Sequence, residues 1–196
     1  SLVPCEWREH KINFIDTPGY ADFVGEVKGV LRAVDSTLVV LCAASGVEVE
    51  TEKVWKYAGE LHLPRIAFIN KMDRENADFY GVIQDMQEKF GPNVLPIQLP
   101  IGAEEDFKGI VDLLKMKAIM PANKQGNQYL ESDIPDDMLE TALVLRQKIT
   151  ELAAETDDEL LNKYLEGEEL SDEEIKNGLL KGISQSTIFP VMCGSA

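Results

Sequence analysis

The stretch RIAFINKMD, residues 65–73, combines a predicted strand with the polar segment that follows it directly. Residues 65–70 are short and mostly apolar, which is typical of a parallel strand buried in a sheet. The next residues carry the side chains of a lysine and an aspartate. In open parallel sheets, ligands bind in the loops at the carboxyl ends of the strands. We therefore expect residues 70–73 to form part of a binding site.

The segments on either side alternate between strand and helix. A strand ends at Asp16, and the apolar run 36–44 predicts another strand, buried on both faces. Helical periodicity follows each strand, over 23–34, 54–62 and 79–90, and Gly25 and Gly29 could let the first helix pack closely. This alternation predicts an α/β fold, an open parallel sheet with helices on both faces, with Asp16 and Asn70 on one rim.

The pattern changes after Leu99. Short alternating segments come first, and prolines on one phase around 95–101 suggest an exposed edge strand. An amphipathic helix follows over 138–152, then a shorter one closed by Gly167 and a third that starts with a Ser171–Glu174 capping box. We predict three parts: a core over 1–98, an inserted α+β subdomain over 99–187, and the last core strand and loop over 188–196.

The net charge of the chain bears on the kinds of partner that it can bind. The 196 residues carry a net charge of −16, which disfavours non-specific binding to DNA or other nucleic acids. Residues 151–174 hold eleven acidic side chains and one basic one, Lys163, and so contribute −10 of this total. They form either a solvated helix face or a docking surface for a basic partner.

The remaining composition indicates a cytoplasmic protein without a membrane segment. The three cysteines, Cys5, Cys42 and Cys193, are far apart and show no disulfide or zinc spacing. The longest apolar run, residues 38–44, is far shorter than a bilayer span, and no signal peptide is visible.

Three polar segments carry the chemistry: DTPG at 16–19, NKMD at 70–73 and CGSA at 193–196. Guanine offers two neighbouring N–H donors, N1–H and the 2-amino group, which one carboxylate can accept together. Asp73 would read these donors. The backbone amides of Ser195 and Ala196 would reach the O6 acceptor.

The other residues of NKMD would support this reading. Asn70 would contact the base edge, the Lys71 stem would lie over the ring, and Met72 would point into the core. In the alternative, Asp73 only caps a turn from Asn76 onward, and CGSA is a simple chain end.

These segments resemble the translational GTPases, and more closely the elongation factor G family. The likeness extends over essentially all residues, including DTPGYADFVGEV, NKMDR, PIQLPIGAEEDFKGIVDLLKMKAI, KYLEGEELSDEEI and CGSA. It implies a partial P-loop-NTPase-type sheet and a cytoplasmic factor that binds GTP or GDP with Mg²⁺.

The same likeness implies roles for DTPG. Asp16 would hold Mg²⁺ through a water molecule, and Thr17 and Pro18 would border the nucleotide. The amide of Gly19 would contact the terminal phosphate and order a switch segment. It also implies a ribosome contact, in which the acidic inserted subdomain meets the stalk protein of the large subunit.

Tyr20 departs from the family pattern, in which a histidine usually orients the attacking water. A phenol lacks the basic nitrogen and is bulkier, so we expect hydrolysis that is slower or differently gated. Tyrosine at this place also resembles a group of elongation factor G paralogues. In the alternative, Tyr20 simply packs at the switch.

The second departure is the absence of any G-x-x-x-x-G-K-[ST] sequence, the loop that cradles the phosphates. We therefore expect a middle piece of the GTP-binding domain of a longer ribosomal translocation factor. Alone it should be inactive and bind nucleotide weakly. The alternatives are a GTP-dependent ribosome-binding paralogue with little hydrolysis, and an acidic domain that binds a basic protein.

Overall fold

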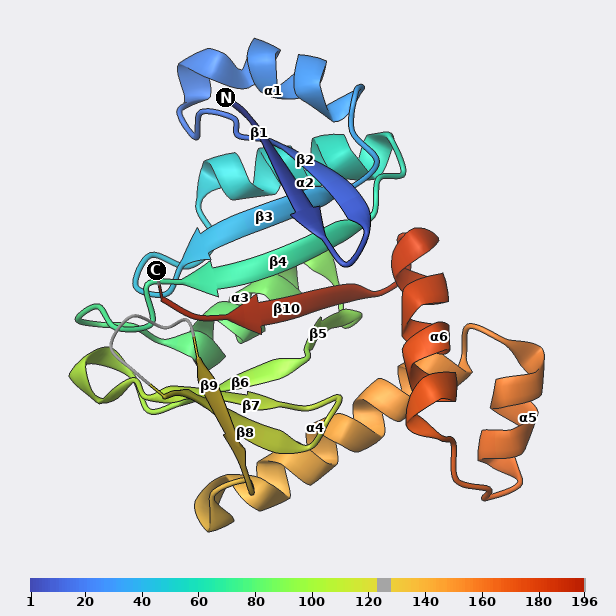
Figure 1. Cartoon of the computed structure of the whole chain (residues 1–196). Helices are drawn as coiled ribbons and strands as arrows, with labels where there is room; N and C mark the ends of the chain where they lie inside the picture. Colours follow the sequence, from blue (N-terminus) through green and yellow to red (C-terminus); the bar gives the residue numbers. More distant parts are fainter. Residues whose placement is uncertain (123–127, 196) are drawn as a thin grey trace.

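A parallel sheet forms the centre of the computed structural model, which describes residues 1–122 and 128–195 (Figure 1). Its strands lie in the order β3, β4, β10, β5. Their bounds are Thr37–Cys42, Arg65–Asn70, Phe189–Cys193 and Val94–Pro96. The last strand in sequence thus occupies an interior position, with Val191 opposite both Ala67 of β4 and Pro96 of β5. The mixed α/β architecture predicted from the sequence is confirmed.

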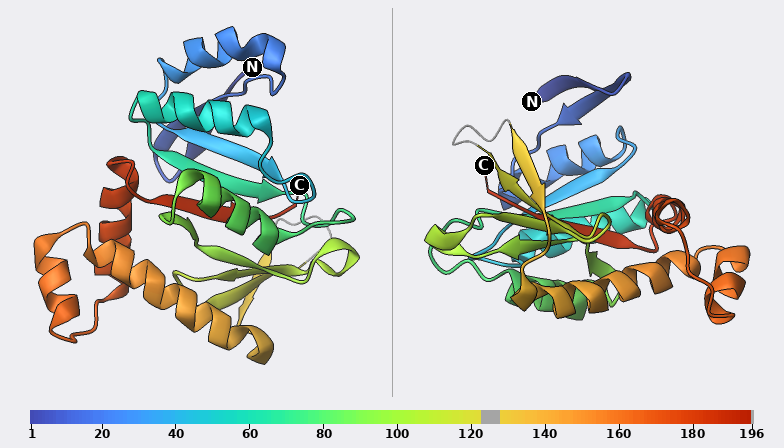
Figure 2. Two further views of the ribbon diagram at one scale, coloured as in Figure 1. Left: turned by 180° about the vertical axis from the view of Figure 1, so that it is seen from behind. Right: turned by 60° about the horizontal axis from the view of Figure 1, so that its bottom comes forward.

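Two helices, α2 (Val49–Glu60) and α3 (Phe79–Phe90), lie on one face of this sheet (Figure 2, left). A short 3-10 turn, η1 (Ala21–Phe23), leads into α1 (Val24–Leu31), which packs on α2 rather than on the sheet. Val27 and Leu31 of α1 form a small core cluster with Ala58 of α2.

The prediction that residues 36–44 are buried on both faces is wrong. Val39 and Leu41 of β3 are buried, whereas Leu38 and Val40 are 50% and 57% exposed. The physical reason is that β3 is an edge strand and α1 lies over α2, so that the second face of β3 stays uncovered.

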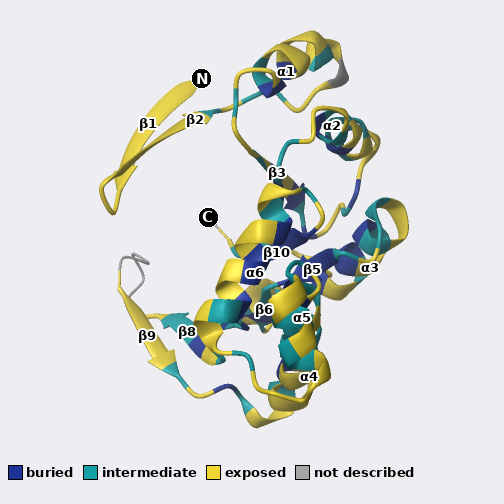
Figure 3. Cartoon of the chain, turned by 90° about the vertical axis from the view of Figure 1, so that its right-hand side faces the viewer, coloured by how far each residue is buried: buried dark blue, intermediate teal, exposed yellow. Residues whose placement is uncertain are grey.

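The strand that ends before Asp16 exists, but it does not join the parallel sheet. β2 (His10–Ile15) pairs antiparallel with β1 (Leu2–Trp7), and this hairpin is exposed along its length (Figure 3). Arg8 and Glu9 both have positive φ, 46° and 66°. A two-residue type I′ turn requires positive φ at both positions, and its geometry matches the right-handed twist of the two strands. β2 pairs with β1 and with no strand of the parallel sheet, so the expected shared rim of Asp16 and Asn70 is not formed.

The region from residue 98 onward forms a second, antiparallel sheet followed by three helices. Its strands, in spatial order, are β6 (Gln98–Ile101), β7 (Gly109–Asp112), β8 (Lys117–Pro121) and β9 (Tyr129–Ser132). The helices are α4 (Asp136–Ala154), α5 (Asp158–Leu165) and α6 (Asp172–Ser184). Pro96 and Pro100 do lie in edge strands, but both are buried, so the predicted exposure is wrong.

The predicted capping box of α6 is confirmed. The Ser171 N–H donates to the Glu174 carboxylate at 2.7 Å, and the Glu174 N–H donates to Ser171 Oγ at 3.3 Å. Lys163, together with these Ser171 donors, lowers the pKa of Glu174 to about 2. The box therefore holds a carboxylate that stays ionised at neutral pH.

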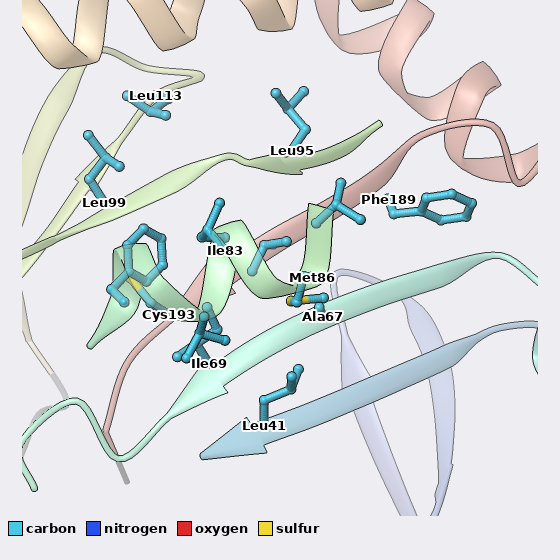
Figure 4. Packing of buried hydrophobic residues seen from close by; sticks show 14 of the residues in the cluster. Leu41, Ala67, Ile69, Ile83, Met86, Leu95, Leu99, Leu113, Phe189 and Cys193 are labelled. Atoms are coloured by element: carbon cyan, nitrogen blue, oxygen red, sulfur yellow. The ribbon is translucent and has the colours of Figure 1, made fainter. Parts of the chain in front are cut away.

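One hydrophobic core connects the two sheets (Figure 4). Ile69 of β4 and Met86 of α3 belong to its part at the parallel sheet, and Leu95, Leu99 and Leu113 continue the cluster into the antiparallel sheet, all with no exposed surface. No helix within residues 1–122 and 128–195 is long and apolar enough to cross a membrane.

Helices α4 and α6 approach each other closely at Gly178. A Cβ at this position would lie 2.5 Å from the Ala153 carbonyl oxygen, and Thr156 Oγ1 bridges the carbonyls of Ala153 and Gly178. By contrast, the close packing expected at Gly25 and Gly29 is wrong, because no described atom lies within 4 Å of a Cβ built at either residue.

Substituting Gly178→Ala should lower the free energy of unfolding by about 1–3 kcal/mol, because the added methyl group forces α4 and α6 apart. The control is Gly29→Ala in α1, which should raise it by about 0.5–1 kcal/mol because alanine favours the helix where space is free. Urea denaturation of the chain followed by circular dichroism measures both. Equal stability of the two variants would contradict the tight contact.

Candidate functional site

The segments that carry Asp73 and Ser195 meet at one edge of the parallel sheet. The Asp73 carboxylate accepts a hydrogen bond from Ser195 Oγ. Behind this contact, the Met72 N–H donates to the Gly194 carbonyl at 3.2 Å, and the Gly194 N–H donates to the Ile69 carbonyl at 3.0 Å. Two of the three predicted segments are therefore in contact, while Ala196 lies outside the described residues.

The strand order explains this meeting. β4 and β10 are parallel neighbours, with Cys193 opposite Ile69, so the loops at their carboxyl ends emerge side by side. Met72 is fully buried and anchors the first loop in the core, whereas Asp73 is exposed. Gly194 permits the approach of the second loop, because a Cβ there would lie 2.9 Å from the ring of Phe68.

The loop after β4 is ordered by its own polar groups. Asn70 Oδ1 accepts the Lys71 N–H at 2.8 Å, and Lys71 has a positive φ of 64°. Both side chains are half-buried, at the base of the loop that presents Asp73.

The alternative in which Asp73 caps the following turn is wrong. The Asn76 N–H donates to Glu104 instead, at 2.6 Å. Helix α3 is capped by Asp78, whose carboxylate accepts the Gly81 N–H at 2.9 Å. The Asp73 carboxylate is therefore not used to start a helix and faces Ser195.

The DTPGY segment, residues 16–20, borders a separate cavity of about 330 Å³ with β3 and α2. None of the described residues that line it comes from 70–73 or 193–195. Asp16 and Gly19 are exposed at its edge, and Thr17 and Pro18 are half-buried. Tyr20 is 78% exposed, so its ring is not buried against the described part of the chain.

The donor set at Asp16 fits a magnesium ion that arrives with phosphate ligands. Within the described part of the chain, no group of three or more His, Cys, Asp or Glu side chains could hold a metal on its own. Mg²⁺ commonly uses one or two carboxylates, several waters and substrate phosphates, and one exposed carboxylate such as Asp16 fits that donor set.

The pKa values of two cysteines at strand ends, Cys193 and Cys42, are shifted in opposite directions. Burial raises the pKa of the Cys193 thiol to about 12, so β10 brings no charge next to the Asp73 loop. Hydrogen bonds from the backbone of Ala44 and Ser45 lower the pKa of Cys42, with a smaller contribution from the Lys71 charge. The charged side chains beside the site therefore come from the loop after β4, which carries Lys71, Asp73, Arg74 and Glu75.

Comparison with known proteins identifies the family. All of residues 1–196 match the family described as the elongation factor Tu GTP binding domain. The chain belongs to this family. The sequence-based resemblance is therefore confirmed, and the two loops described above lie in a GTP-binding domain of the elongation factor Tu type.

Relatives of this family cover the chain in full. It is 47% identical to elongation factor G of Thermotoga maritima and to that of Thermotoga sp. strain RQ2, over all 196 residues. The chain spans 28% of the length of these relatives. A solved protein of Thermus thermophilus is similar in structure, with a TM-score of 0.90 and 36% identity over 99% of this chain and 29% of its own.

Sequence reasoning missed two residues that touch the site from the second sheet. Glu104 bonds to the Asp73 loop, and Gln98 Oε1 accepts the Cys193 N–H at 3.2 Å. The isolated polar position of Gln98 among the apolar residues 95–101 was a signal for its contact. Glu104 gave no comparable signal, because it stands in an acidic turn typical of a solvated surface.

Proposed function

We propose that these residues form part of the GTP-binding domain of a ribosomal translocation factor similar to elongation factor G. In this proposal the intact factor hydrolyses GTP and couples hydrolysis to movement of tRNA and mRNA. The observation that carries the proposal is the contact between Asp73 and Ser195, in a chain of this family. The alternative is a paralogue that binds the ribosome in a GTP-dependent way with weak hydrolysis, which the tyrosine at position 20 favours.

The two loops are suited to read guanine. A carboxylate has about four lone-pair sites, so Asp73 can keep the Ser195 hydroxyl and still accept N1–H and the 2-amino group. In this proposal the amides of Ser195 and Ala196 face O6, Asn70 contacts the base edge, and the Lys71 stem lies over the ring.

The DTPGY segment would act at the phosphate end. Asp16 would hold Mg²⁺ through a water, next to Thr17 and Pro18, and the Gly19 amide would contact the terminal phosphate. A bound Mg²⁺ would neutralise charge on the phosphates. Tyr20 can donate a hydrogen bond to water or phosphate but cannot act as an imidazolium. Because the chain contains no G-x-x-x-x-G-K-[ST] loop, the 196 residues alone should bind nucleotide weakly and not hydrolyse it.

Replacing Asp73→Asn in the intact factor should invert base preference. Losing two charge-assisted hydrogen bonds should weaken GDP binding by about a hundredfold or more, while xanthosine diphosphate, which has a carbonyl in place of the 2-amino group, should bind more tightly. Competition titration measures both affinities. The matched control is Glu75→Gln, which neutralises an exposed carboxylate in the same loop and should leave the affinities for both nucleotides unchanged. Unaltered preference in Asp73→Asn would refute guanine reading by this residue.

Tyr20→His should speed single-turnover GTP hydrolysis in the presence of ribosomes, because the imidazole can orient water and carry charge. Tyr20→Phe should slow it by about tenfold, the effect of one hydrogen bond to a charged group. The measurement is rapid-quench kinetics on the intact factor. If both variants match the wild-type rate, Tyr20 has no part in hydrolysis and the paralogue alternative loses its support.

The acidic surface of α4 and α5 is proposed to meet the ribosomal stalk protein. Three acids at or beside this surface are already paired, namely Asp157 with Lys181, and Asp172 and Glu174 of α6 with Arg146 and Lys163. Four others are exposed and are the proposed docking residues, namely Glu151, Glu155, Asp158 and Glu159.

Neutralising these four docking residues should slow ribosome-stimulated GTP turnover and flatten its dependence on salt, because charge steers the encounter with a basic partner. Turnover at several ionic strengths measures both. The control variant neutralises four exposed acids elsewhere, namely Glu26, Asp35, Glu60 and Glu88. A docking role would be refuted by the same salt dependence in the test variant and the wild type.

A further inference from the structure

The turn between β6 and β7 holds the Asp73 loop from the side of the second sheet. This turn contains a short 3-10 segment, η2 (Glu104–Asp106). The Glu104 N–H donates to the Met72 carbonyl at 2.8 Å, and Glu104 Oε1 accepts the Asn76 N–H at 2.6 Å. Glu104 is therefore bonded to the chain just before Asp73 and again three residues after it.

Three residues where the Asp73 loop meets the turn between β6 and β7 have a left-handed backbone. Lys71, Asn76 and Glu104 have φ values of 64°, 63° and 55°, in the left-handed region that non-glycine residues rarely adopt. Such conformations persist where surrounding contacts over-determine them, and they gather at ligand-binding positions. Glutamate has no intrinsic preference for this region, and the two bonds that Glu104 makes to the Asp73 loop help to stabilise its conformation.

The same part of the second sheet also holds the other loop. Gln98, at the start of β6, accepts the Cys193 N–H through Oε1 at 3.2 Å, two residues before Ser195. The Met72 peptide bonds to Glu104 through its carbonyl and to Gly194 through its N–H. One strand and turn of the second sheet thus touch both loops that bring Asp73 and Ser195 together.

We propose that Glu104 is a positioning residue for base recognition. By accepting the Asn76 N–H, its carboxylate fixes the short loop on which Asp73 stands, and so the direction in which the Asp73 carboxylate faces the base. The inference rests on the proposed guanine binding. It assigns to the inserted part of the chain an indirect contribution, through Asp73, to selectivity between purines that differ in the 2-amino group.

A purely structural role for Glu104 would have a different signature. Loss of loop stability alone would lower the unfolding temperature and weaken all nucleotides by the same factor. Misdirection of Asp73 should affect guanine more than hypoxanthine, because hypoxanthine lacks the 2-amino group and can lose only one of the two bonds to the carboxylate. The affinity ratio between GDP and inosine diphosphate therefore separates the two roles.

The test uses the intact factor with the variants Glu104→Gly and Glu104→Gln. Glycine removes the carboxylate, keeps the N–H bond to Met72 and favours the positive φ, so the variant should fold without loss of thermal stability. We expect Glu104→Gly to weaken GDP binding about tenfold and inosine diphosphate binding about threefold or less. Glu104→Gln keeps an oxygen acceptor and should retain most of the wild-type ratio.

Glu105→Gly is the matched control, since it removes the neighbouring exposed carboxylate and should leave the ratio unchanged. If the wild type prefers GDP but Glu104→Gly keeps the same ratio, or Glu105→Gly lowers it equally, the positioning role is overturned while guanine reading stands. If the wild type does not distinguish the two nucleotides, the proposed function and the inference fail together.

Discussion

The parallel pairing of β10 with β4 is the constraint on which the site depends. With Cys193 held opposite Ile69, the two loops leave the sheet at the same level and one strand spacing apart. The hydrogen bonds between Met72, Gly194 and Ile69 then fix the distance between the loops. The contact of Asp73 with Ser195 follows from that pairing, although the two residues are 122 positions apart in the sequence.

The second sheet is structurally continuous with the first rather than an appended module. Leu95, Leu99 and Leu113 carry one core across both sheets, and the Ile97 N–H donates to the Val191 carbonyl at 3.0 Å. Arg146 adds a link between the helices and this sheet, donating to the carbonyls of Leu113 and Leu114. The helices are therefore joined to the second sheet by hydrogen bonds, and the second sheet is joined to β10 by a shared core.

Local features of the fold could be predicted from the sequence, and features set by distant partners could not. The periodic helices, the strand 65–70 and the capping box at Ser171 depend on neighbouring residues, and the structure contains them. The predictions that β3 is buried on both faces and that β2 joins the parallel sheet were wrong, because the composition does not reveal which strands pair with each other. Within the site, the meeting of Asp73 with Ser195 was predictable because NKMD and CGSA were both expected to contact one guanine base. The contact of Glu104 was not, since it depends on a φ of 55° that its residue type disfavours.

The interior position of β10 also constrains the order of folding. β5 ends at Pro96 and its sheet partner β10 begins at Phe189, so the slot between β4 and β5 stays open while the ribosome synthesises everything between them. During that interval the edges of β4 and β5 offer unpaired backbone groups, which is a hazard for association with other chains. Early folding of β6–β9 and α4–α6 would bring the end of β5 and the start of β10 closer together. The last strand could then enter the gap between β4 and β5 as soon as it is synthesised.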